Sequence, residues 1–189
     1  MQFFVRPGTE LEWFKHWKEE RLRWHLSLGI PAEKYRYHDH EKLAHYANAA
    51  TDIEFEFPFG FKELEGIHSR TDFDLSNHSK FSGKKLQYFD PETNESYTPY
   101  VIETSIGLDR MFLAMLSHAY TEEKLEDGSE RVVMKFPAAL EPYKVAILPL
   151  VKKDGLPEKA REIMDQLTPD FMCQYEEKDS IGKRYRRQD

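Results

Sequence analysis

The chain has 189 residues, a formal net charge of −7 at pH 7, and a composition that is 40% hydrophobic and 32% charged. This balance is typical of a folded globular protein and excludes an intrinsically disordered chain. The longest apolar runs are too short to cross a bilayer, so no membrane span is expected. The acidic total argues against nonspecific coating of nucleic acid. A single cysteine, Cys173, excludes an internal disulfide and fits a reducing, cytoplasmic location.

The first elements are predicted to be a strand and a long helix. Residues 2–5 read as a strand that ends at a Pro-Gly turn. A helix is expected over 10–28, with Thr9 as its N-cap and Gly29 as its C′ residue. Tryptophans at helical spacing are more often core residues than a stacking platform. We therefore predict that the core includes Trp13, Trp17 and Trp24.

A polar stretch after this helix contains His38, His40 and His45. A His-x-His pair on a strand places two imidazoles on one face, which is a possible zinc arrangement. No Cys or suitably spaced His completes a ligand set, so we do not predict a metal site here.

A β-hairpin is predicted from strict alternation over 52–57, a Pro-Phe-Gly turn, and a second strand over 61–67. The residues expected to face a core are Ile53, Phe55 and Phe57. Simple alternation puts Glu63 and Glu65 on one face, where like charges at this spacing repel. That face is either solvated or holds cations. Gly66 in mid-strand indicates that another group packs closely there.

The next part of the chain is predicted to be irregular, with a polar loop over 68–75 and a flexible loop over 76–85. After these loops we expect a strand over 86–89, a turn over 90–94 and a strand over 96–105. Farther along the chain we expect an acidic turn over 121–130 and a strand over 131–136.

The stretch 99–110 carries polar groups in a strand that would otherwise be apolar. Alternation puts Glu103 and Ser105 on the same face. A helix follows, and Arg110 lies in its first turn, where the macrodipole disfavours a cation. We therefore expect an anionic partner for Arg110; a surface pair with Glu103 or Asp109 is the simplest structural alternative. The helix has an apolar stripe made of Leu108, Met111, Phe112, Met115, Leu116 and Ala119.

The pattern changes after a linker over 137–142. Residues 143–151 are predicted as a strand buried on both faces, followed by a helix over 157–167 and a strand over 171–175. This order implies a parallel βαβ unit. A basic helix is expected from Ser180 onward.

Both ends of the sequence resemble the interior of a domain. The chain starts directly in a strand-like segment and stops inside the basic helix, whereas complete domains usually end in polar, frayed segments. We therefore expect a piece of a longer protein. Residues 178–189 carry five cations and two acids, a basic patch in an acidic chain.

Several short motifs occur along the chain in a defined order. They are Phe4–Gly8, Ala44–Ala47, Glu63–Gly66, Arg70–Leu75, Glu103–Arg110 and Asp179–Arg187. The Gly-Leu-Asp-Arg run at 107–110, which opens an amphipathic helix, resembles motif 3 of the class II aminoacyl-tRNA synthetases. The whole set resembles the homodimeric glycyl-tRNA synthetase family within that class, over essentially all of the chain.

The resemblance implies an α+β fold. Residues 1–138 would form a partial class II synthetase core, an antiparallel sheet with helices in which motif 3 is present and motifs 1 and 2 are missing. Residues 142–189 would form the start of an α/β anticodon-binding domain. The parent protein would be a cytoplasmic homodimer that uses ATP and Mg²⁺ to activate glycine as glycyl-adenylate and transfers it to tRNA(Gly). Because two motifs are missing, the isolated chain is expected to be inactive.

The resemblance also implies roles for individual residues. Arg110 would meet the γ-phosphate of ATP, and Glu63 would act at the ATP through Mg²⁺. Glu103 would take the ammonium of glycine, and Arg70 is a weaker candidate for the phosphate site of Arg110. The implied ATP-binding residues are Glu63, Leu64, Gly107, Leu108, Asp109 and Arg110. The implied glycine-binding residues are Glu103, Thr104, Ser105, Ile106 and Gly107.

Two alternatives stay open. A non-catalytic, synthetase-like accessory or nucleic-acid-binding protein would keep the fold and lose the acids and the arginine. The presence of Glu63, Glu103, Ser105 and Arg110 favours the enzyme. A class II synthetase for threonine, proline or histidine would need a larger pocket, and the Glu-Thr-Ser-Ile-Gly run fits glycine better.

Overall fold

The computed structural model describes residues 1–188, which form two units that separate between Ser117 and His118. In the first unit the elements are β1 (Gln2–Val5), α1 (Glu10–Ser27), the short 3₁₀ turn η1 (Ala32–Lys34), β2 (Tyr35–Asp39), β3 (Ala49–Phe57), β4 (Gly60–Ser69), α2 (Phe73–Ser82), β5 (Tyr88–Asp90), β6 (Glu95–Tyr97), β7 (Tyr100–Ile106) and α3 (Leu108–Ala119). The division falls near the end of α3, earlier than the limits of 138 and 142 expected from the sequence.

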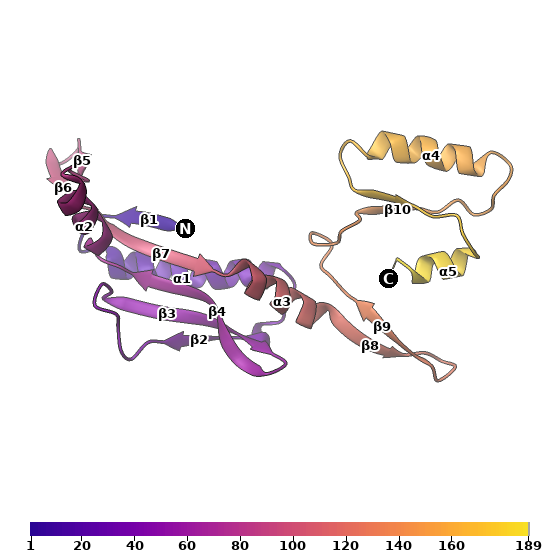
Figure 1. Cartoon of the computed structure of the whole chain (residues 1–189), viewed down its shortest axis with the longest axis horizontal. Helices are drawn as coiled ribbons and strands as arrows, with labels where there is room; N and C mark the ends of the chain where they lie inside the picture. Colours follow the sequence, from indigo (N-terminus) through magenta and orange to yellow (C-terminus); the bar gives the residue numbers. More distant parts are fainter. Residues whose placement is uncertain (189) are drawn as a thin grey trace. The chain divides into compact units, whose positions relative to one another are not determined.

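The first unit is built on a five-stranded sheet in the order β1-β7-β4-β3-β2, and every neighbouring pair is antiparallel. Helix α1 packs along one face of this sheet, against β3, β4 and β7 (Figure 1). The α+β class expected from the sequence is confirmed. An antiparallel sheet needs to be covered on one face only. Because α1 covers one face here, the other face is available for side chains that bind or react.

The core lies between the sheet and its helices. The alternation of β3 is confirmed, because Ile53, Phe55 and Phe57 are at most 4% exposed. The core cluster is Ile30, Tyr35, Ile53, Phe55, Phe57, Leu64, Ile67, Ala114 and Met115. On α3, burial at 114 and 115 leaves the first part of the predicted apolar stripe uncovered, since Leu108 is 82% and Phe112 is 62% exposed.

Helix α1 differs from the prediction in two details. Trp13 and Trp24 are exposed and not core residues. Trp13 packs against Phe3 of the edge strand and so covers the margin of the sheet, whereas the Arg21 guanidinium of the same helix lies over the Trp24 ring. Thr9 occupies the N-cap position, but its hydroxyl donates to the carbonyl of residue 6 and caps no helical N–H.

The hairpin of β3 and β4 contains an irregularity that alternation does not predict. The pairing shifts between Ile53 and Glu54: Ile53 stands opposite Glu65, Glu54 stands opposite Glu63, and Leu64 is the extra residue. Cross-strand partners share a face of the sheet. Glu65 therefore lies on the helix side and Glu63 on the open side. The expectation that the two acids share a face is wrong.

Helix α2 occupies the region where loops were expected, and that prediction is wrong. Its sequence has no apolar periodicity, so pattern analysis misses it. Polar side chains bond the backbone within the helix instead: Asn77 donates to the carbonyl of Phe73, and Ser82 donates to that of His78. Gly83 ends the helix in the left-handed region, with φ of 69°.

The second unit contains a hairpin and a βαβ arrangement. Its elements are β8 (Tyr120–Lys124), β9 (Glu130–Met134), β10 (Val145–Ile147), α4 (Leu156–Leu167), β11 (Cys173–Tyr175) and α5 (Ile181–Arg186). Strand β8 includes residues 121–124, which were predicted to belong to the acidic turn. The parallel pairing of β10 with β11 confirms the βαβ prediction. Strand β10 is much shorter than 143–151, because within residues 1–188 it pairs with the three-residue strand β11 alone; Leu150 is 64% exposed.

Within residues 1–188, none of the helices has both the length and the apolar character needed to cross a bilayer.

Candidate functional site

The open face of the sheet, the face turned away from α1, carries the polar residues of β4 and β7. Glu103 stands directly opposite His68, and Ser105 stands directly opposite Gly66. Because residues two apart on a strand share a face, Glu103 and Ser105 point the same way, as the sequence predicts. Thr104 faces the helix side and is buried, so its side chain does not reach the open face.

Arg110 and Glu63 meet at one end of this face. The guanidinium Nη1 of Arg110 donates to the Glu63 carbonyl at 2.9 Å and lies 3.5 Å from the Glu63 carboxylate. Both side chains are more than half exposed, so the pair adds little to stability. The anionic partner expected for Arg110 therefore exists, and it is Glu63, not Glu103 or Asp109. Because this pair is exposed and weak, either side chain can release the other and contact a ligand instead.

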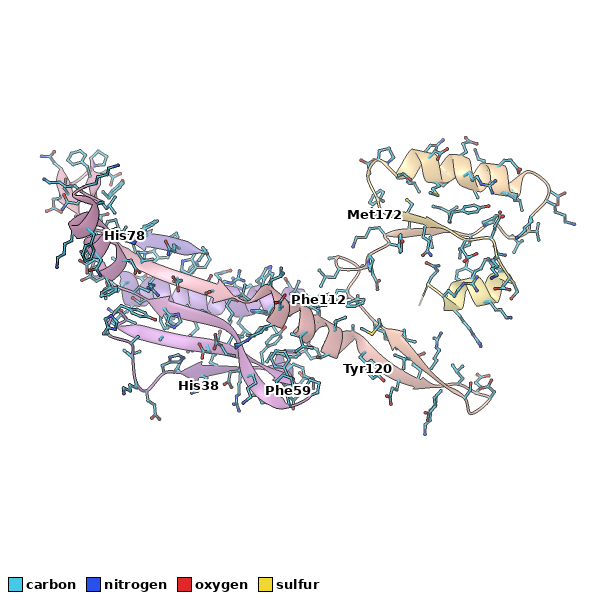
Figure 2. The ribbon with its side chains drawn as sticks, viewed as in Figure 1. His38, Phe59, His78, Phe112, Tyr120 and Met172 are labelled. Atoms are coloured by element: carbon cyan, nitrogen blue, oxygen red, sulfur yellow. The ribbon has the colours of Figure 1, made fainter. Side chains whose placement is uncertain are left out.

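A cavity of about 470 Å³ adjoins this pair. Its lining combines aromatic, cationic and anionic side chains: Phe57, Phe59, Lys62, Glu63, Arg110 and Leu113. The Phe57 and Phe59 rings are stacked with an interplanar angle of 2°. Phe59 lies at the β3–β4 turn and Phe112 lies on α3, as Figure 2 shows. Two cations beside the exposed Phe59 ring can bind a flat, anionic ligand such as a nucleotide.

Arg70 lies toward the opposite end of the open face. Its guanidinium holds the Asp74 carboxylate at 2.7 and 3.1 Å, lies 3.4 Å from Glu103, and covers the Tyr46 ring. The hydrogen bond to Asp74 is the main reason that the pKa of Arg70 is raised. The structure thus brings Arg70 to the Glu103 carboxylate and does not bring it to Arg110.

Two histidines of the open face pair with acids. His40 Nε2 lies 2.9 Å from Asp52, and His38 Nδ1 lies 3.3 Å from Glu54. In the described part of the chain, no group of three or more His, Cys, Asp or Glu side chains is placed to hold a metal ion. Sequence reasoning missed Asp52 and His68 as members of this face, because only the strand pairing brings them beside Glu103.

Two further predicted residues differ from simple expectation. The Leu64 side chain is 1% exposed and belongs to the core, so only its backbone can face a ligand. Gly107 does not adopt a positive φ, and an added Cβ would meet nothing closer than 3.8 Å. The backbone at Gly107 therefore does not require glycine. Leu108 and Asp109 are exposed at the start of α3.

The donor set fits a magnesium ion held mainly by a substrate. Mg²⁺ commonly takes one or two protein carboxylates and completes its octahedron with phosphates and water. The Glu63 carboxylate is about half exposed and, among residues 1–188, forms an ion pair with Arg110 alone, at 3.5 Å. A dedicated cage of protein ligands is not needed for such an ion.

Comparison with known proteins places this geometry in context. No family model matches the chain. The whole chain aligns with glycine–tRNA ligases of Chlorobaculum tepidum at 57% identity, Geobacillus thermodenitrificans at 54% and Treponema denticola at 51%. It covers 40%, 41% and 44% of those proteins respectively. The chain thus spans about two fifths of the length of the curated relatives it matches.

A solved structure shares the fold. The structure of Giardia lamblia prolyl-tRNA synthetase in complex with prolyl-adenylate superposes with a TM-score of 0.57 over 97% of this chain and 36% of that one, at 18% identity. At this identity the likeness concerns the fold alone. Over its whole length, the chain is homologous to part of the glycine–tRNA ligases, and it has the fold of a class II aminoacyl-tRNA synthetase.

Proposed function

We propose that the open face of the five-stranded sheet forms part of the ATP- and glycine-binding site of a glycine–tRNA ligase. The observation that carries this proposal is the placement of Glu103 and Ser105 on one face of β7, with the Arg110–Glu63 pair at the end of the same region. A carboxylate for an ammonium group and an arginine for phosphates are the groups that such a reaction requires. Homology to glycine–tRNA ligases over the whole chain supports it.

The proposed reaction joins the carboxylate of glycine to the α-phosphate of ATP. A bond forms between a glycine carboxylate oxygen and the α-phosphorus, the bond to the bridging oxygen breaks, and pyrophosphate leaves with the electron pair. No protein nucleophile is needed, so catalysis rests on positioning and charge neutralisation. Glu103 holds the ammonium, Ser105 orients the substrate by hydrogen bonding, and Arg110 neutralises phosphate charge.

Magnesium fits beside these residues as a partner of the nucleotide. When bound, it neutralises charge on the phosphates, and Glu63 is the carboxylate in this chain that would hold it. In the structure, the Glu63 carboxylate lies 3.5 Å from Arg110. Glu63 would hold the ion and Arg110 would contact phosphate, and their weak, exposed mutual pair is no obstacle to either contact.

The wider setting is also a proposal. The whole protein would work in the cytoplasm as a homodimer and transfer glycine to tRNA(Gly). Residues 1–138 would belong to its catalytic core and 142–189 to the start of its anticodon-binding domain. The parallel βαβ arrangement of β10, α4 and β11 supports the second assignment. A non-catalytic accessory protein is the alternative; it gains no support from a face that keeps Glu63, Glu103, Ser105 and Arg110.

A chimera tests the proposed function directly. The corresponding part of the Chlorobaculum tepidum ligase, 57% identical, is replaced by this chain. We expect glycine-dependent ATP–pyrophosphate exchange from the chimera and none above background from the isolated chain. Arg110→Ala should lower kcat by about 10²- to 10³-fold. Lys124→Ala, at a highly exposed position on β8, is the matched control. Full exchange activity in the Arg110 variant would overturn the proposal.

A further inference from the structure

The His68 ring covers a gap in the open face that Gly66 creates. A Cβ built on Gly66 would lie 2.9 Å from His68 Cε1, 3.5 Å from His68 Nδ1 and 3.5 Å from Asp52 Oδ1. The imidazole and the carboxylate therefore converge above a residue that has no side chain. Ser105 stands opposite Gly66, and Glu103 stands opposite His68, so this converging point lies in the middle of the proposed glycine-binding residues.

One nitrogen of the His68 ring lacks a protein partner. Nδ1 is buried and makes no hydrogen bond with any residue in the described range 1–188. Its neighbour Asp52 is oriented by His40, whose Nε2 lies 2.9 Å from Oδ2 of that carboxylate. This contact leaves Asp52 Oδ1 turned toward Gly66. A buried polar atom without a partner carries a free-energy cost, which a ligand that bonds it would recover.

The surroundings of His68 favour the neutral form of its ring. Burial lowers the pKa of the imidazole, and this effect exceeds the opposing influence of Glu103 and Asp52; His40 and Arg70 lower the pKa further. A neutral imidazole with its proton on Nε2 presents Nδ1 as a hydrogen-bond acceptor. The group at the centre of the open face is therefore suited to a donor, such as an ammonium group.

We propose that His68 is a specificity-determining residue of the amino-acid site. Its Nδ1 accepts a hydrogen bond from the substrate ammonium beside Glu103, and its ring occupies the space above Gly66 that the side chain of any larger amino acid would need. This inference rests on the proposed function and adds to it the group that admits glycine and rejects a substrate with a Cβ. Steric exclusion of one carbon is effective only against a rigid wall, and the packing of His40 against His68 supplies the support.

The test uses the 189-residue chain with ¹⁵N-labelled histidines, titrated with glycine and with L-alanine at millimolar concentrations. We expect glycine to move the backbone amides of Glu103 and Ser105 and the Nδ1 resonance of His68 together. L-Alanine should bind at least about tenfold more weakly. In His68→Ala this preference should fall by about tenfold, whereas His38→Ala, on the same face but paired with Glu54, should keep it.

The outcomes separate the two proposals. If glycine moves Glu103 and Ser105 but leaves His68 Nδ1 unchanged, or if His68→Ala keeps the full preference for glycine, the role of His68 is overturned and the proposed function stands. If glycine moves none of these residues, both fall. His68→Asn keeps a polar side chain but removes the ring, so it distinguishes loss of steric exclusion from loss of structure. The amide spectrum shows whether the variant is folded. A folded variant should bind glycine and L-alanine with similar affinity. A folded Asn variant that still prefers glycine would also overturn the proposal.

Discussion

Glu63 and Glu65 are two residues apart on β4, yet their carboxylates lie on opposite faces of the sheet. Glu65 is 1% exposed and binds α1, with Arg21 Nε at 2.6 Å and His25 Nε2 at 2.8 Å. Glu63 faces Arg110 on the open side. The bulge at Leu64 separates them. We infer that the buried contacts of Glu65 hold the bulge in place and thereby present Glu63 to the open face.

Glu65→Gln should destabilise the first unit by about 2–4 kcal/mol, because removing one member of a buried ion pair leaves Arg21 and His25 without a charged partner. Urea denaturation of the chain, followed by tryptophan fluorescence, measures this change, since all three tryptophans lie on α1. Glu56→Gln is the control, because its pair with Lys34 is exposed and should contribute at most about 1 kcal/mol. Equal losses in the two variants would contradict the assigned role of Glu65.

The same network predicts an acid limb in the stability profile. Burial alone would raise the pKa of Glu65, but the hydrogen bonds from His25 and Arg21 outweigh burial and hold the pKa below its ordinary value. The unfolded chain therefore binds the proton more readily than the folded chain does. The stability that Glu65 contributes is present above the unfolded pKa of about 4.3 and is lost as the pH falls through the folded pKa.

Denaturation midpoints between about pH 3 and pH 6 measure this limb. The wild-type chain should lose more stability on acidification than Glu65→Gln does, because the amide has no proton to bind. Parallel pH profiles for the two proteins would show that Glu65 is not held ionised by its partners.

How far the sequence predicts the structure depends on whether a feature is local. The alternation of Ile53, Phe55 and Phe57 is local, and it predicts β3 correctly. The likeness of 107–110 to motif 3 predicts a strand-to-helix element correctly. The face of Glu65 is not local, because it depends on how β3 pairs with β4. Helix α2 consists mainly of polar residues, which leave no apolar period to detect.

The same reasoning explains which parts of the site could be predicted. Glu103 and Ser105 share a face by simple alternation, so the sequence suffices for them. His68 and Asp52 join that face only through strand register, which a single sequence does not reveal. The position of Arg110 in the first turn of its helix predicts that its partner is an anion. The sequence does not show that this anion is Glu63 and not the neighbouring Asp109, because Glu63 is far away along the chain.

Gly66→Ala should displace the His68 ring. The new Cβ would lie 2.9 Å from Cε1, so the imidazole must rotate away, and we expect a loss of about 1–3 kcal/mol in stability. The NMR signals of the His68 ring should shift strongly. Gly107→Ala is the control, because its Cβ has space and its φ is not positive; its stability should be unchanged or higher by up to about 1 kcal/mol. An unshifted His68 signal in the Gly66 variant would show that the ring does not lie over this residue.

Arg184 was counted in the basic patch of the C-terminal segment, but the structure gives it a different position. It is 3% exposed, and its guanidinium donates to the carbonyls of Pro149, Leu150 and Glu176. These bonds tie α5 to the segments that follow β10 and β11. The side chain is therefore a structural support of the second unit and is not available to a nucleic acid.

Arg184→Met should destabilise the second unit by about 3 kcal/mol, because one buried and two partly buried hydrogen bonds to carbonyls are lost and methionine replaces only the packing of the stem. Hydrogen exchange of the β10 and β11 amides measures the effect, and protection should fall by about 10²-fold if these strands open with the unit. Lys183→Met changes the adjacent, exposed cation and should leave protection unchanged. If the two variants lose equal protection, the effect comes from the charge of the helix and not from the buried contacts of Arg184.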